Sequence, residues 1–136
     1  MSGYRGGMAQ SHPQVVDPQH PLVTVVREIC LQFPESVEVE AWGRPTFRAG
    51  RKIFVTVGAG MDAPLTIVVK PGSADERLAY LEREGFYSPP YWGPGGWIAV
   101  PIDGAVSREE LAEIIDTSYR GVALVRQIKA LDARSS

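Results

Sequence analysis

Residues 46–57 read TFRAGRKIFVTV, and they predict a β-hairpin. Two runs containing β-branched and aromatic residues, which are typical of strands, flank Ala49-Gly50-Arg51. Glycine readily adopts the backbone angles of a tight turn, so we expect Gly50 at the tip. Because so short a turn reverses the chain, the two strands pair antiparallel.

Strands are also predicted on both sides of this hairpin. Residues 37–41 (VEVEA) alternate apolar and acidic residues, which is typical of a half-exposed strand. Residues 65–69 (LTIVV) are apolar enough for the interior of a sheet, and the Gly/Ala/Pro-rich residues 58–64 form the loop before them. After an irregular stretch over residues 86–95, residues 96–100 (GWIAV) predict a last strand.

Three helices are predicted around these strands. The first begins at Pro21 and stops at Pro34. Its apolar residues follow the 3.6-residue period on one face: Leu22, Val25, Val26, Ile29, Cys30 and Phe33. Capping boxes open the other two, Ser73 with Glu76 and Ser107 with Glu110, and the last helix carries apolar residues from Leu111 to Val125. The fold class expected is α+β, a two-layer sandwich of an antiparallel sheet with helices packed on one face.

Length and composition favour one intracellular domain. The 136 residues include one cysteine, Cys30, which suits a reducing compartment, and no apolar run approaches the ~20 residues of a membrane helix. Residues 1–20 are rich in Gly, Pro, Gln and Ser and predict a mobile tail, which leaves residues 21–132 as the domain. The N-terminus lacks the apolar segment of a signal peptide, so we expect a cytoplasmic protein.

No recognisable catalytic apparatus stands out in the sequence. Both histidines, His12 and His20, lie in the predicted tail, so Cys30 has no structured base beside it. Zinc-type spacing and the glycine-rich phosphate motifs are absent. Acidic residues at the start of the last helix either bind a hard cation weakly or offset the helix dipole: Glu109, Glu110, Glu113 and Asp116. We therefore expect a protein that is not an enzyme and needs no cofactor or metal.

The charges are unevenly distributed along the chain. The net charge is −2, yet residues 41–72 carry five basic residues against Asp62, so the remainder totals −6. The basic residues are Arg44, Arg48, Arg51, Lys52 and Lys70. Arginine binds phosphate through paired donors, so with Trp42 this group suits a phosphate-bearing partner. The alternative is structural: Trp42 and Phe47 belong to the core, and the cations keep a hairpin edge soluble.

A second group of aromatic residues lies between Phe86 and Trp97. Tyr91 and Trp97, with their Pro and Gly neighbours, either form a stacking platform for bases or a groove for a peptide, or they fix the loop onto the sheet.

Several short motifs together resemble the MmcQ/YjbR family. They are Ala41-Trp42-Gly43-Arg44-Pro45-Thr46-Phe47-Arg48, Lys52-Ile53-Phe54, Val69-Lys70, Glu76-Arg77, Tyr91, Gly96-Trp97 and Ser118-Tyr119. The resemblance covers residues 22–131, and it implies an α+β fold with an antiparallel sheet, comparable to the frataxin-like and secretion-chaperone-like folds. The family is commonly labelled DNA-binding, by analogy to exposed hairpin wings, and no enzymatic activity is generally assigned to it.

These observations lead to three hypotheses about the partner. The first is weak, salt-dependent binding of DNA through Arg44, Arg48, Arg51, Lys52 and Lys70, with Trp42, Tyr91 and Trp97 as aromatic contacts. The second is a protein partner, bound by the aromatic loop or by an open sheet edge. The third is a small-molecule pocket lined by Trp42, Trp92 and Trp97.

Overall fold

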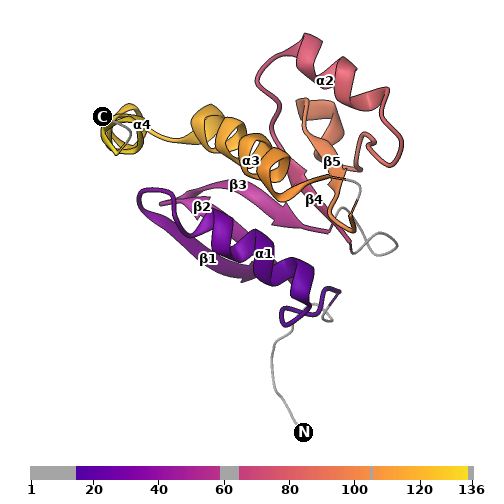
Figure 1. Cartoon of the computed structure of the whole chain (residues 1–136), viewed down its shortest axis with the longest axis horizontal. Helices are drawn as coiled ribbons and strands as arrows, with labels where there is room; N and C mark the ends of the chain where they lie inside the picture. Colours follow the sequence, from indigo (N-terminus) through magenta and orange to yellow (C-terminus); the bar gives the residue numbers. More distant parts are fainter. Residues whose placement is uncertain (1–14, 59–64, 105, 135–136) are drawn as a thin grey trace, which may run out of the picture.

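The computed structural model describes residues 15–58, 65–104 and 106–134. Figure 1 shows a sheet with helices packed against it. The elements follow the chain in this order: α1 (Pro21–Cys30), β1 (Ser36–Ala41), β2 (Arg44–Ala49), β3 (Lys52–Val57), β4 (Thr66–Val69), α2 (Ala74–Leu81), the 3₁₀ turn η1 (Gly93–Gly95), β5 (Ile98–Pro101), α3 (Arg108–Val122) and α4 (Val125–Ala133).

The strands form one antiparallel sheet in the order β1-β2-β3-β4-β5. The predicted hairpin is β2–β3, with Ala49 opposite Lys52 and Gly50 in the left-handed region at φ 68°. A β-bulge follows Phe47, because Phe47 pairs with Val55 but the next residue pairs with Ile53. The strand prediction is confirmed, and every connection within the sheet is between neighbours.

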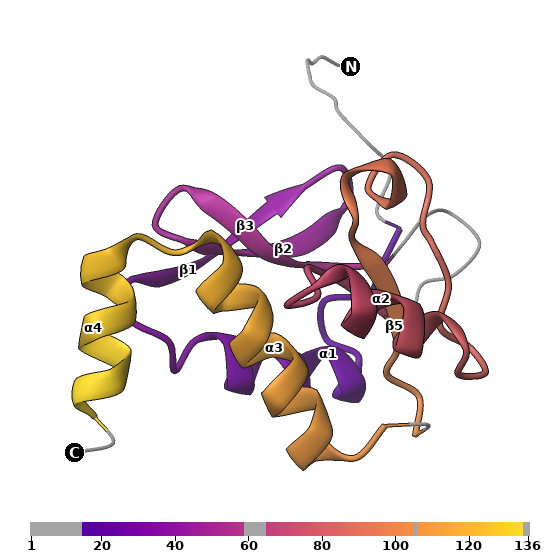
Figure 2. The same cartoon turned by 90° about the horizontal axis from the view of Figure 1, so that it is seen from above.

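The hydrophobic core lies between one face of the sheet and the helices α1 and α3 (Figure 2). Phe54 of β3 and Tyr119 of α3 are both fully buried, and their ring centroids are 5.2 Å apart. Phe33 stacks on the Tyr119 ring at 4.8 Å. Burial of such apolar side chains is the main stabilising contribution to the fold, and the α+β class expected from the sequence is confirmed.

The predicted tail is wrong for residues 15–20. The backbone amides of Val15 and Val16 donate to the carbonyl of Gly43, and Val16 is only 3 % exposed within the core. His20 caps α1, because its Nδ1 accepts from the amide of Leu22 at 3.1 Å. Residues 1–14 lie outside the described residues, as does the loop predicted over 58–64 beyond residue 58.

The predicted last helix is divided in two. α3 ends at Val122, where Ala123 and Leu124 adopt extended backbone angles, and α4 begins at Val125. Val125 is 69 % exposed rather than part of the buried stripe. The break turns the chain, so α4 packs at the end of the sheet (Figure 2).

Smaller corrections concern the edge of the sheet and the helix caps. β1 is not half-buried: its four central residues are all exposed, because it pairs on one side only. Ser73 and Ser107 cap their helices as predicted. The reciprocal half of each box is missing, since Glu76 accepts from Gly72 and the Glu110 carboxylate binds Arg83. No helix in the described ranges is long and apolar enough to span a membrane.

Candidate nucleic-acid interface

The tip of the β2–β3 hairpin presents two cations to solvent. Arg51 and Lys52 are exposed, and they follow directly on the turn at Gly50. No carboxylate in the described part of the chain forms an ion pair with either residue. Their charges are therefore directed to solvent, as required of groups that bind an external anion.

Helix α4 packs directly against this tip. Gln127 is 2 % exposed, and a Cβ built on Gly50 would lie 3.3 Å from its Nε2. The Gln127 Oε1 accepts from the amide of Leu124 at 2.8 Å, which caps the first turn of α4, while Nε2 donates to Glu35 at 3.0 Å. The amide of Gly50 donates to the Glu35 carbonyl at 2.9 Å. Glu35 and Gln127 thus fasten the helix to the hairpin.

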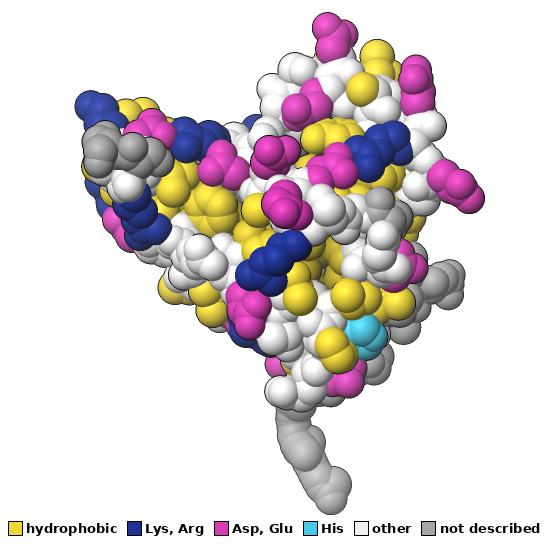
Figure 3. Space-filling model, viewed as in Figure 1, with side chains coloured by type: hydrophobic (Ala, Val, Ile, Leu, Met, Phe, Trp, Pro, Cys, Tyr) yellow, Lys and Arg dark blue, Asp and Glu magenta, His cyan; other side chains and the backbone are white. Residues whose placement is uncertain are grey.

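This packing adds one cation from α4 beside the tip. Arg126 binds the Glu35 carboxylate, whereas Lys129 is exposed two positions after Gln127 and therefore lies on nearly the opposite side of the helix from the hairpin. Figure 3 shows several Lys and Arg side chains around α4, with Asp or Glu among them, and it shows both acidic and basic side chains over α2 and α3. We call Arg51, Lys52 and Arg126 the tip surface. With Glu35 included, its formal charge is +2.

Hydrogen bonds to Arg126 and Gln127 lower the pKa of Glu35 below its usual value. The carboxylate therefore stays ionised at neutral pH and neutralises part of the charge of Arg126.

Two of the cations predicted to bind phosphate instead donate hydrogen bonds to backbone carbonyls of the protein. Arg44 donates through Nη1 to the carbonyl of Gly58 at 2.5 Å, and burial lowers the pKa of its guanidinium. Lys70 donates through Nζ to the carbonyl of Gly121 at 3.2 Å, near the C-terminus of α3, where a cation also complements the helix dipole.

The remaining predicted residues on this hairpin lie at opposite ends of β2. Arg48 is next to the tip, because its pair with Ile53 adjoins the closing pair of Ala49 and Lys52, but it is half-buried, with its Nε 3.4 Å from the hydroxyl of Thr46. Trp42 is 49 % exposed in the turn between β1 and β2, so it is not a core residue, whereas Phe47 is. A strand of this length spans about 20 Å, so Trp42 and the tip are at opposite ends of β2.

In the aromatic loop, residues 86–97, some side chains fix the loop onto the sheet and one is exposed to solvent. Trp92 and Trp97 are half-buried with ring centroids 4.9 Å apart, and Arg77 donates from α2 to Ser88, so these residues fix the loop. Tyr91 is 97 % exposed, in the left-handed backbone region at φ 67°. This loop lies on the side of the sheet away from α1 and α3 (Figure 2).

The groups with catalytic chemistry have structural surroundings. Cys30 is buried in the core, and this burial raises the pKa of its thiol well above the usual value. Within the described ranges no three His, Cys, Asp or Glu side chains are grouped so that they could hold a metal ion.

Comparison with known proteins identifies the family that the short sequence motifs resemble. The family model described as YjbR matches residues 31–121, which is most of the chain. The chain belongs to the YjbR family. A crystal structure of the Deinococcus radiodurans protein DR2400, which carries the family domain DUF419, is similar in fold to this YjbR chain. Its TM-score is 0.56 at 22 % identity, covering 79 % of this chain and 85 % of that one. No curated protein gave a significant match.

Sequence reasoning on this YjbR protein missed the part of the tip surface that α4 supplies. Arg126 is visible as a basic residue, but the helix containing it was predicted as a continuation of α3. No residue type signals this helix start, because its N-cap is Leu124, whose side chain cannot cap a helix.

Proposed function

We propose that this chain is a non-enzymatic binding domain whose tip surface binds the phosphate backbone of DNA weakly and without reading the base sequence. One observation carries the proposal: Arg51 and Lys52 are exposed at a hairpin tip, with no carboxylate of the described chain paired to them, and α4 adds further positive charge beside them. Lysine and arginine side chains on such a surface release counterions from duplex DNA when they neutralise phosphates.

The absence of base readout follows from the shape of the tip surface. Contacts from long cationic side chains to phosphates position a protein on DNA but carry no sequence information. Arg44 and Lys70 are bonded to backbone carbonyls, and Trp42 lies at the far end of β2. Fewer side chains are therefore available to contact phosphates than the sequence suggested. Weak binding follows from so few contacts. The burial of Cys30 and the capping role of His20 support the non-enzymatic part of the proposal.

A charge-matched pair of variants tests this surface. Arg51→Ala/Lys52→Ala and Arg83→Ala/Arg108→Ala both lower the net charge by two, but Arg83 and Arg108 bind Glu110 and Glu28 away from the tip. In fluorescence anisotropy with a short labelled duplex at low salt, we expect the tip variant to lose about tenfold or more in affinity. The control should change much less. Equal losses in both variants would show that only the overall charge matters, and the tip surface would be rejected.

A further inference from the structure

A second surface, the outer edge of strand β1, has the features of a site that pairs with an added strand. β1 bonds to β2 only, and it ends the sheet on that side. The other edge strand, β5, is covered in part, because Tyr87 exchanges hydrogen bonds of 3.2 and 2.8 Å with Ala99. In the described part of the chain, β1 is therefore the open edge of the sheet.

The turn that follows β1 fixes which of its backbone groups face outward. Trp42 and Gly43 form a two-residue loop with φ values of 56° and 79°, so Ala41 and Arg44 close the hairpin as a hydrogen-bonded pair. Bonded pairs alternate along an antiparallel ladder, so Val39 and Val37 also bond inward. The carbonyl of Val39 agrees with this, since it accepts from the Thr46 hydroxyl at 2.5 Å.

The backbone N–H and C=O groups of Glu38 and Glu40 consequently point away from β2. No described residue forms a backbone hydrogen bond with them on that side. Two such residues present two donors and two acceptors to an added strand.

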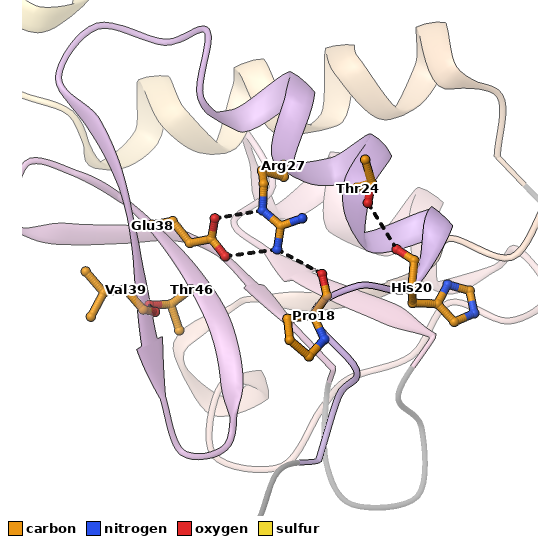
Figure 4. Close-up of polar contacts among 7 residues, drawn as sticks. All are labelled: Pro18, His20, Thr24, Arg27, Glu38, Val39 and Thr46. Atoms are coloured by element: carbon orange, nitrogen blue, oxygen red, sulfur yellow. Dashed lines mark hydrogen bonds and ion pairs between the residues drawn. The ribbon is translucent and has the colours of Figure 1, made fainter.

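The side chains of β1 divide by face. Val37 and Val39 are 43 % and 38 % exposed on the face away from α1, while Glu38 and Glu40 lie on the helix face. Arg27 of α1 holds Glu38 through bonds of 2.8 and 3.1 Å and also donates to the carbonyl of Pro18 (Figure 4). Glu40 is exposed and forms no ion pair with a described residue. The edge is therefore apolar on one face and acidic on the other.

We propose that β1 binds an extended segment of a partner protein in which Lys or Arg alternates with apolar residues. An added strand gains affinity from main-chain bonds, and its alternate side chains supply the specificity. Opposite charges directly across neighbouring strands attract, so a basic residue of the segment fits beside Glu40, since Glu38 is already held by Arg27, and the apolar residues of the segment extend the row of Val37 and Val39.

The charges also argue against the other occupants of this edge. If β1 paired antiparallel with β1 of a second copy, Glu38 and Glu40 would face the same carboxylates of that copy, and like charges across strands are destabilising. Nucleic acid would be repelled by the same groups. An acidic edge thus rejects self-pairing and admits a basic strand. This inference goes beyond DNA binding and concerns a different surface.

Three labelled peptides test the proposal on the full chain. One alternates Lys and Val, one alternates Glu and Val, and one has the Lys and Val residues in separate blocks. We expect the first to bind most tightly in fluorescence anisotropy and to protect the amides of Glu38 and Glu40 from hydrogen exchange. Equal binding of the block peptide, or protection at other strands only, would overturn the proposal.

Variants at Glu40 separate edge pairing from general charge. Glu40→Pro removes an outward N–H together with the carboxylate and leaves the β1–β2 bonds intact, as proline on an edge strand allows. Peptide binding should therefore fall at least about tenfold, and further than in Glu40→Gln, which removes the charge alone, with little change in melting temperature. Glu40→Lys should weaken binding of the Lys/Val peptide and allow the Glu/Val peptide to bind, whereas Glu84→Lys, exposed beyond α2, should do neither. Unchanged binding by Glu40→Pro, or a wild-type dimer in sedimentation that this substitution dissociates, would contradict the assigned occupant.

Discussion

Individual residues of the family motifs hold the elements together. The buried hydroxyl of Ser118 in α3 donates to the carbonyl of Phe54 at 2.6 Å and accepts from the amide of Lys70 at 2.9 Å, so it joins β3 and the end of β4. The Tyr119 hydroxyl donates to the carbonyl of Pro34 at 2.7 Å. In this chain the Ser-Tyr motif is therefore a structural connection between helix and sheet.

Replacing Ser118 should lower the free energy of unfolding by more than the loss of an exposed hydroxyl group does. Ser118→Ala leaves a backbone N–H and a C=O buried without a side-chain partner, which we expect to cost about 2–4 kcal/mol in the free energy of unfolding. Ser73→Ala, the loss of an exposed helix cap, serves as comparison and should cost about 1 kcal/mol. Urea unfolding of both variants measures the difference. A smaller loss for Ser118→Ala than for Ser73→Ala would contradict the connecting role.

At the scale of elements, the sheet could be predicted and the chain ends could not. Period-two patterns and Gly50 identify the β2–β3 hairpin, because these signals are local. The bulge after Phe47 makes both Phe54 and Val55 face the core, and this depends on packing that no alternation reveals. The break before α4 occurs at Ala123 and Leu124, which are good helix formers, so nothing in the local sequence indicates it. The orientation of Arg48 depends on the bulge, and the position of Arg126 in the tip surface depends on the break before α4.

Val16 is the residue through which the N-terminal segment is most deeply buried in the core. Val16 is buried in the core, so Val16→Ala should cost about 2 kcal/mol in the free energy of unfolding. Val15→Ala, at a half-buried position, should cost less. For the same reason a chain lacking residues 1–19 should melt at a lower temperature than one lacking residues 1–14. Equal melting temperatures for the two truncated chains would show that Val16 does not support the core.

The attachment of α4 should depend on pH. The pKa of Glu35 is lowered in the folded protein by its bonds to Arg126 and Gln127, so this contribution to stability is complete above the unfolded value of about 4.3. It is lost as the pH falls through the folded pKa. Unfolding measured from pH 7 to pH 3 should therefore show a smaller acid dependence for Glu35→Gln than for wild type. Superimposable pH profiles would mean that Glu35 does not link α4 to the hairpin through its charge.

At the scale of the whole molecule, opposite charges are separated on two surfaces. The tip surface is positive, whereas the edge strand β1 is acidic, and the chain as a whole carries −2. The net charge therefore weakens any approach to DNA, and only the local surface favours it. The two proposed partners, DNA and a basic strand, would therefore bind at separate surfaces.

The salt dependence of DNA binding tests the central claim most directly, because it counts the phosphates that the protein neutralises. About three contacts from the tip surface predict a slope of about −2 to −3 for log K against log[salt] on duplex DNA. Affinity should be in the range of about 10⁻⁴ to 10⁻⁶ M at physiological salt and should be the same for unrelated sequences. The measurement is a salt titration of fluorescence anisotropy on two such duplexes. No binding even at low salt, or affinities that depend on the duplex sequence, would contradict the account.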